Sequence, residues 1–147
     1  MAIQKDIKLF VVDDDVFCLN LYQQFLFKLG YTQVVCYNGG KDCLDNLAQM
    51  PDIIFLDYNM EEMNGIAVLQ RIKQFDPAIS VVFISGQENV EIAVDALKYG
   101  AFDYIVKSKI TLDLLKRTVD HIISEKGIMH APSKKSLFGR MKSNLGM

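Results

Sequence analysis

The sequence predicts an α/β fold, a doubly wound five-stranded parallel sheet with five helices on its two faces. Three observations predict this fold class. Five short apolar runs, rich in β-branched residues, recur along the 147 residues, as expected of strands buried on both faces. Segments with the apolar spacing of helices separate these runs, and glycine or proline ends most of the segments. Strict alternation of strand and helix requires right-handed crossovers and therefore a parallel sheet.

The expected strands are apolar runs of three to five residues. They cover residues 8–12, 34–37, 53–56, 81–84 and 104–106. The expected helices each repeat apolar residues at helical spacing. These repeats are Cys18, Leu21, Phe25 and Leu29; Leu44 and Leu47; Ile66, Leu69 and Ile72; Val90, Ala93, Val94 and Leu97; and Leu112, Leu115, Val119 and Ile122. The first four helices are expected to end at Gly30, before Pro51, before Pro77 and at Gly100, and Thr111 is the expected N-cap of the fifth.

Polar residues stand directly after four of the five runs. They are Asp13 and Asp14, Asp57, Ser85, and Lys107. Five βα units favour the flavodoxin-like strand order 2-1-3-4-5, in which ligands bind at the carboxyl ends of the strands. The four strand ends then converge on one crevice. Three carboxylates, a hydroxyl and an ammonium in one crevice suit a divalent cation and a phosphoryl group.

Each of these residues also has a simpler interpretation. Acids at 13–15 suit a helix N-terminus, and Asp15 is the natural cap. Asp57 could cap a turn, but a strand-end carboxylate beside a metal is also an oxygen nucleophile that can form an aspartyl phosphate. Lys107 could lie at the surface, whereas a buried Lys107 would require the carboxylate cluster as its partner. Gly86 after Ser85 either leaves room for a ligand or makes a tight turn.

Size, cysteine content and charge exclude several classes of protein. The chain has the length of one domain, and 50% hydrophobic residues allow a real core. Its three cysteines show neither disulfide nor zinc-site spacing. Charges at positions 5, 6 and 8 are unlike a signal peptide, and no apolar run is long enough for a membrane span, so we expect a cytoplasmic protein.

The composition changes near Gly127. Residues 1–126 are the expected domain, and residues 127–147 are expected to form a basic flexible tail or linker. The tail holds four of the 16 Lys and Arg residues and none of the 18 acids, so the domain carries a charge of −6. That charge opposes direct nucleic-acid binding by the domain. Leu137, Met141 and Leu145 could form a short amphipathic helix that docks on a protein or an acidic membrane surface.

The stretches VVDDD, FLDYNMEEMNG, FISGQ and YGAFDYIVK, in this order, resemble the receiver domain of response regulators in two-component signalling. The resemblance covers residues 6–126 and implies a signalling phosphoacceptor with only self-phosphorylation and self-dephosphorylation chemistry, not an enzyme. It implies that Asp57 takes the phosphoryl group from a phosphohistidine of a sensor histidine kinase or a phosphotransfer protein. It also implies a Mg²⁺ ion, replaceable by Mn²⁺, that is held by Asp13, Asp14, Asp57 and the backbone carbonyl of Asn59.

The resemblance further implies which residues contact the phosphoryl group and respond to it. Lys107 would pair with phosphorylated Asp57, and Ser85 would bond a phosphoryl oxygen. Ser85 and the aromatic Tyr104 would act as the switch. The fourth helix, fifth strand and fifth helix would then form the face for a downstream protein target, and the active form could dimerise.

Four positions depart from the family pattern. Ser108 stands where a proline usually follows the lysine, and Glu61 replaces another common proline. Asn64 stands where an acid commonly precedes the glycine, and Ser85 replaces the commoner threonine. A cis bond before a residue other than proline is costly, so we expect a trans bond before Ser108 and a loop that differs from that of the relatives.

Other functions fit parts of the pattern. A receiver-like interaction module that is not phosphorylated agrees with Ser108 and Glu61, while the intact Asp57 and Lys107 oppose it. A phosphohydrolase with an aspartyl nucleophile would need further adjacent acids after Lys107 and a cap-sized insertion, and the sequence has neither. A flavodoxin-type cofactor binder would carry hydroxyls and glycines after its first strand, where acids stand here.

Overall fold

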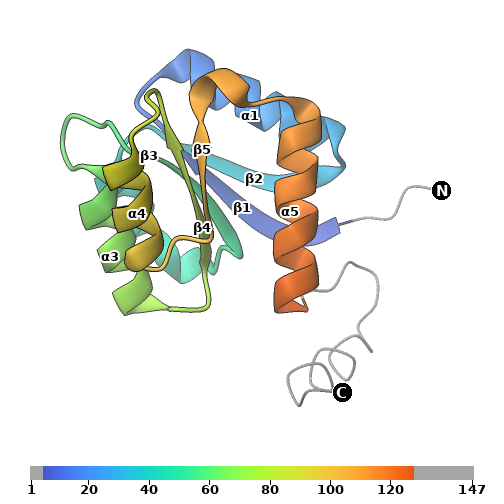
Figure 1. Ribbon diagram of the computed structural model, residues 1–147. Coiled ribbons are helices and arrows are strands. Elements are labelled where there is room, and N and C mark those ends of the chain that lie inside the picture. Colours follow the sequence, from blue (N-terminus) through green and yellow to red (C-terminus); the bar gives the residue numbers. More distant parts are fainter. Residues whose placement is uncertain (1–4, 128–147) are drawn as a thin grey trace.

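The computed structural model describes residues 5–127, which form a parallel sheet flanked by helices (Figure 1). Its strand order is β2-β1-β3-β4-β5, which confirms the predicted fold class and order. The strands are β1 (Lys5–Val12), β2 (Tyr31–Tyr37), β3 (Ile53–Asp57), β4 (Ser80–Ser85) and β5 (Asp103–Val106). The tail and its expected short helix at residues 128–147 lie outside the described residues.

All five expected helices are present among residues 5–127. They are α1 (Val16–Lys28), α2 (Gly40–Asp45), α3 (Gly65–Phe75), α4 (Val90–Lys98) and α5 (Leu112–Lys126). Four of them are preceded by an N-cap residue whose side chain accepts a backbone N–H of the first turn. These caps are Asp15, Asn64, Asn89 and Thr111. The expected caps Asp15 and Thr111 are confirmed. Asn64, which departs from the family pattern, is the cap of α3.

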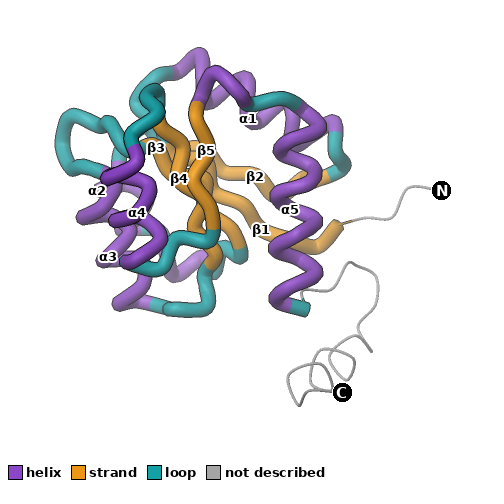
Figure 2. Tube along the Cα trace, viewed as in Figure 1, coloured by secondary structure: helices purple, strands orange, loops and turns teal. Residues whose placement is uncertain are grey.

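Helices cover both faces of the sheet, as Figure 2 shows. On one face, α1 and α5 pack against the strands through a core that includes Leu26, Phe55 and Val119. On the other face, α2, α3 and α4 build a second core that includes Leu69 and Phe83. The central strands β3 and β4 are buried along their whole length. This burial explains why their sequences are almost continuously apolar.

The second helix is shorter than its sequence predicts. It ends at Asp45, and a 3₁₀ turn at Leu47–Gln49 replaces the expected last turn before Pro51. The side-chain amide of Asn46 donates to the carbonyl of Asp42 at 2.7 Å, which competes with continued helical hydrogen bonding. Within residues 5–127, no helix has the length and apolar character needed to cross a membrane.

Candidate functional site

The strand register brings the four polar strand ends together. Val12 of β1 pairs with Leu56 of β3, so Asp13 and Asp57 are neighbours across the two strands. Across β4 and β5, Ser85 pairs with Val106, the residue before Lys107. The expected convergence on one edge of the sheet therefore occurs.

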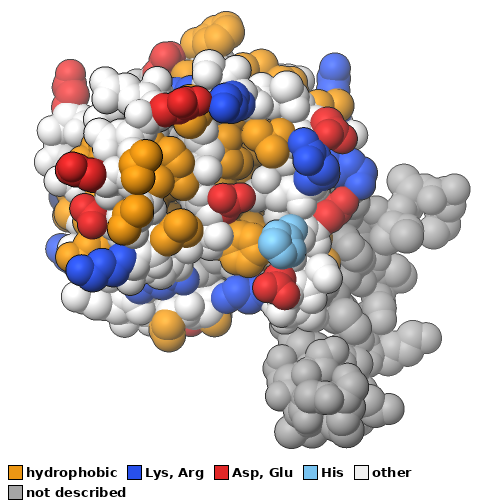
Figure 3. Space-filling model, in the orientation of Figure 1, with side chains coloured by type: hydrophobic (Ala, Val, Ile, Leu, Met, Phe, Trp, Pro, Cys, Tyr) orange, Lys and Arg blue, Asp and Glu red, His pale blue; other side chains and the backbone are white. Residues whose placement is uncertain are grey.

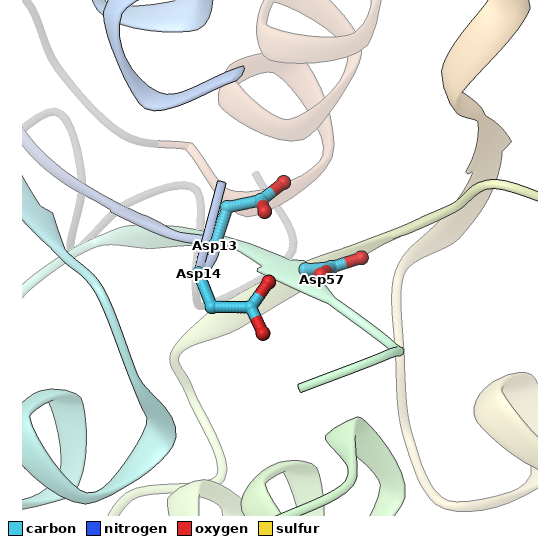
Figure 4. Close-up of side chains that lie close together, drawn as sticks. All are labelled: Asp13, Asp14 and Asp57. Atoms are coloured by element: carbon cyan, nitrogen blue, oxygen red, sulfur yellow. The ribbon is translucent and has the colours of Figure 1, made fainter. Parts of the chain in front are cut away.

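Three carboxylates form a cluster at this edge (Figure 4). Asp13, Asp14 and Asp57 each offer one oxygen, and these oxygens lie within 4.8 Å of one another. Asp13 and Asp57 are only 1% and 2% exposed, whereas Asp14 is exposed. Like charges this close and this buried repel one another, which favours either protonation or a cation.

Backbone contacts hold Asp13 in place. Its backbone N–H donates to the carbonyl of Tyr37 at 3.1 Å, and its Oδ1 accepts the backbone N–H of Asp15 at 2.9 Å. Asp15 in turn caps α1, because its Oδ1 accepts the backbone N–H of Phe17. The three consecutive acids therefore have different structural roles. Asp15 caps α1, while Asp13 and Asp14 belong to the carboxylate cluster.

Lys107 supplies the positive charge of the cluster. Its Nζ lies 3.0 Å from Asp13 Oδ2 and 3.4 Å from Asp57 Oδ1, and its side chain is 25% exposed. These two carboxylate oxygens are buried and accept no other hydrogen bond from the described residues. Burial acts to lower the pKa of Lys107, but the hydrogen bond with Asp13 and the charge of Asp57 outweigh it, so the pKa is raised. Lys107 is therefore a charged partner of both buried acids, as the sequence predicts.

Asp57 has a strongly altered affinity for protons. Its pKa is raised from 3.8 to about 7, mainly by burial and also by the charge of Asp13. The Lys107 ammonium and the backbone N–H of Asn59 oppose this rise only in part. A cation at the cluster would favour the ionised form of Asp57.

This pKa makes stability depend on pH. Between about pH 4 and about pH 7 the folded chain retains a proton that the unfolded chain has released, so stability falls as the pH rises. We expect the free energy of unfolding, measured with urea and a metal chelator, to fall across this window. Asp57→Asn should remove this part of the pH dependence of the free energy of unfolding. The variant should also be more stable than the natural protein at about pH 8. Identical slopes for the two proteins would contradict the raised pKa.

Ser85 is fully buried at the end of β4. Its Oγ accepts the backbone N–H of Gln87 at 3.3 Å, so the hydroxyl is tied to the β4–α4 loop. A side chain added at Gly86 would meet nothing within 4 Å, which agrees with the expected room for a ligand beside Ser85.

Tyr104 is connected to the same loop. Its ring is half-buried, and its hydroxyl donates to the carbonyl of Gln87 at 2.7 Å. Lys109, in the 3₁₀ turn Lys107–Lys109 that follows β5, pairs with Glu88 at 3.1 Å. Two contacts that the sequence did not predict therefore hold the loop after Ser85, one to strand β5 and one to the turn that begins with Lys107.

Tyr104→Phe tests the first of these contacts. Loss of one exposed hydrogen bond should cost about 1 kcal/mol of global stability or less. Amide hydrogens of residues 86–89 should exchange faster, because the loop loses its bond to β5. Hydrogen–deuterium exchange by mass spectrometry measures this, and Tyr99→Phe, which removes an exposed hydroxyl elsewhere, is the control. Unchanged loop exchange in Tyr104→Phe would show that the contact does not hold the loop.

Gly65 is a site residue that the sequence reasoning missed. A Cβ at this position would lie 2.4 Å from the buried Phe83 ring and 2.9 Å from the backbone oxygen of Asp57. The first turn of α3 thus packs directly against the strand end that carries Asp57. The signal was available, since glycine is a poor helix former and yet follows the cap Asn64 directly.

Comparison with known proteins defines the class. The response regulator receiver domain family matches residues 9–120. The chain belongs to this family of two-component signalling domains. Receiver domains bind magnesium at an acidic pocket, and Asp13, Asp14 and Asp57 form an acidic cluster here.

Individual relatives agree with this class. The transcriptional regulatory protein ZraR of Salmonella typhimurium is 33% identical over an alignment 148 residues long, which includes 99% of this chain and 33% of that protein. ZraR of Escherichia coli K12 is 38% identical over 129 residues, which cover 87% of this chain and 28% of that protein. The chain therefore spans about a third of the length of these curated relatives.

Solved receiver structures share the fold. A response regulator receiver domain protein from Clostridium thermocellum superimposes with a TM-score of 0.76 at 25% identity, covering 82% of this chain and 97% of that one. A response regulator from Thermotoga maritima has a TM-score of 0.72 at 26% identity, covering 80% of this chain and 98% of that one.

Proposed function

We propose that the protein is the phosphoacceptor of a two-component phosphorelay. Asp57 would take a phosphoryl group from the phosphohistidine of a sensor histidine kinase or a phosphotransfer protein. An Asp57 oxygen forms a bond to phosphorus, the bond from phosphorus to the histidine nitrogen breaks, and the donor imidazole leaves. The observation that carries this proposal is the Lys107 ammonium, 3.0 Å from Asp13 Oδ2 and 3.4 Å from Asp57 Oδ1, at two buried carboxylate oxygens that accept no other hydrogen bond from the described residues.

The donor set fits Mg²⁺. Oxygen ligands lie about 2.1 Å from this ion, so two of them are at most about 4.2 Å apart. The three oxygens within 4.8 Å need a small movement, or a water between one of them and the ion. We assign Asp13, Asp14, Asp57 and the Asn59 backbone carbonyl to this site, with Mn²⁺ as a substitute. When bound, the metal would neutralise charge on the phosphoryl oxygens.

Lys107 and Ser85 would bind the remaining phosphoryl oxygens. Phosphorylation adds up to about two negative charges and three acceptor oxygens. Ser85 Oγ accepts the Gln87 N–H and would donate its own proton to a phosphoryl oxygen, so a movement of Ser85 toward the phosphoryl group would pull on Gln87, whose carbonyl accepts the Tyr104 hydroxyl. Movement of Ser85 therefore reaches Tyr104 through one loop residue. A change from 1:99 to 99:1 in favour of the active state needs about 5.5 kcal/mol.

This switch would act on the face formed by α4, β5 and α5. A downstream protein would bind there, and a phosphorylation-dependent dimer could use the same face. We assign residues 1–126 to the receiver domain and residues 127–147 to the basic tail. We also propose that the protein acts in the cytoplasm, that its domain does not bind nucleic acid directly, and that its own chemistry is limited to gaining and losing the phosphoryl group.

The function is tested with acetyl phosphate and Mg²⁺. Intact-mass spectrometry should show one added phosphoryl group on the natural protein and on Asp45→Asn, which changes an exposed acid of α2. Asp57→Asn should show none. No added mass on the natural protein, together with no NMR response to beryllofluoride and Mg²⁺, would reject the proposal. The alternative, a receiver-like interaction module that is not phosphorylated, would then stand.

A further inference from the structure

The outer side of α4 carries an apolar stripe. Val90, Val94 and Leu97 are 78%, 55% and 52% exposed. Their spacing of four and three residues places them on one face of the helix. Figure 3 shows hydrophobic side chains gathered over α4 on this face of the molecule. Single exposed apolar residues are ordinary, but a continuous stripe of three indicates a surface that contacts something else.

Acidic side chains border this stripe. Glu91 and Asp95 are exposed, and each follows a stripe residue by one position on the same helix. Asp103 is exposed at the start of the neighbouring strand β5. Lys98 is the one basic residue of α4. The surface therefore suits a partner that is both apolar and basic.

The tail of the same chain has this composition. Residues 127–147 contain no acid and four basic residues, which are Lys134, Lys135, Arg140 and Lys142. In a helix, Leu137, Met141 and Leu145 would share one side and span about 12 Å, close to the roughly 10 Å from Val90 to Leu97. A helix this short is unstable in water without a surface to pack on.

The start of the tail lies near the end of α4. Lys126, the last residue of α5, donates from Nζ to the carbonyl of Ala78 at 2.8 Å. Lys73 binds the carbonyl of Ile79 in the same turn, and its side chain lies 3.3 Å from a Cβ placed on Gly100, just beyond α4. Both helices therefore end beside the α3–β4 turn. Six residues of extended chain, 128–133, reach about 20 Å, enough to bring residues 134–147 to the stripe.

We propose that residues 134–147 dock on the α4 stripe of their own chain. The tail's apolar residues would cover Val90, Val94 and Leu97, and its basic residues would face Glu91 and Asp95. Because the tether is short, the effective concentration of the tail at the stripe is in the millimolar range, so weak contacts suffice. The docked tail would exclude other proteins from part of the α4, β5 and α5 face. That consequence rests on the proposed function, whereas the docking itself does not.

Hydrogen–deuterium exchange on the full chain, without phosphodonor, tests the docking. If docking is favoured about tenfold, amides of residues 137–145 should exchange about tenfold more slowly than in Val94→Asp. The double variant Leu137→Asp, Met141→Asp should show the same loss of protection, and high salt should weaken it. Phe75→Asp is the matched control, because Phe75 is 52% exposed and lies in a separate groove between α2 and α3.

The outcomes separate the possible docking places of the tail. Tail protection that Val94→Asp removes and Phe75→Asp retains supports docking on α4. Protection removed only by Phe75→Asp would place the tail in the α2–α3 groove and overturn the proposal. A tail that exchanges equally fast in all variants would also overturn it. Because no phosphoryl group is involved, these results do not depend on whether Asp57 is a phosphoacceptor.

Discussion

Lys107→Met should destabilise the metal-free protein by about 3–5 kcal/mol at about pH 8. The ammonium is the cationic partner of two acids that are 1% and 2% exposed, at 3.0 Å and 3.4 Å. Without it, two buried carboxylates face each other with no compensating charge, and the pKa of Asp57 rises above its present value of about 7. Urea unfolding in the presence of a chelator measures the loss.

The pH dependence makes this prediction specific. At about pH 5 Asp57 is already protonated in the folded protein, so the same variant should lose much less stability. Lys109→Met is the control, because that lysine is 67% exposed and pairs with the exposed Glu88. It should cost less than about 1 kcal/mol at either pH. Equal losses for Lys107→Met at the two pH values would contradict the electrostatic explanation.

Gly65→Ala should destabilise the protein by about 3 kcal/mol and disturb the position of Asp57. The added Cβ would lie 2.4 Å from Phe83, whose ring is fully buried, and 2.9 Å from backbone atoms of Asp57 and Tyr58. Neither a buried ring nor two backbone atoms can move away cheaply, so α3 must shift away from β3. Thermal and urea unfolding measure the stability, and the rate of phosphorylation by acetyl phosphate reports the position of Asp57.

Gly86→Ala separates this steric effect from a general effect of removing glycine. A Cβ at Gly86 meets no atom within 4 Å, so this change should alter stability by no more than about 0.5 kcal/mol. If Gly65→Ala proves as stable as Gly86→Ala, then α3 does not pack against the strand end in the way described.

Most of the fold could be predicted because its cause is local. Buried parallel strands such as Ile53–Asp57 need apolar residues throughout, and helices such as Leu112–Lys126 need an apolar face and a cap, and both patterns are visible in the sequence. The predicted end of α2 was wrong by one turn, because a single side-chain contact from Asn46 competes with continued helical hydrogen bonding. The longer β2 was missed because its first half has exposed residues between Tyr31 and Val34.

Part of the site could also be predicted, because local sequence patterns define the strands at whose ends its residues lie. The order of the strands makes Asp13, Asp57, Ser85 and Lys107 neighbours, and the structure confirms that they are. What the sequence could not predict depends on contacts between elements that are far apart in the chain. The bond from Tyr104 to the Gln87 carbonyl requires the path of the β4–α4 loop relative to β5. So does the tight packing of Gly65. The roles of Asp13, Asp57, Ser85 and Lys107 in phosphoryl transfer remain predictions. So does the role of the Asn59 carbonyl.

The proposed function depends most on the identity of the atom that takes the phosphoryl group. The protein can be phosphorylated with acetyl phosphate and Mg²⁺ and then treated with borohydride, which reduces an aspartyl phosphate to homoserine. Peptide mass spectrometry then finds the modified position. We expect homoserine at position 57 and at no other acid of the cluster. Homoserine at position 13 or 14, or a phosphoryl group that resists borohydride, would contradict it.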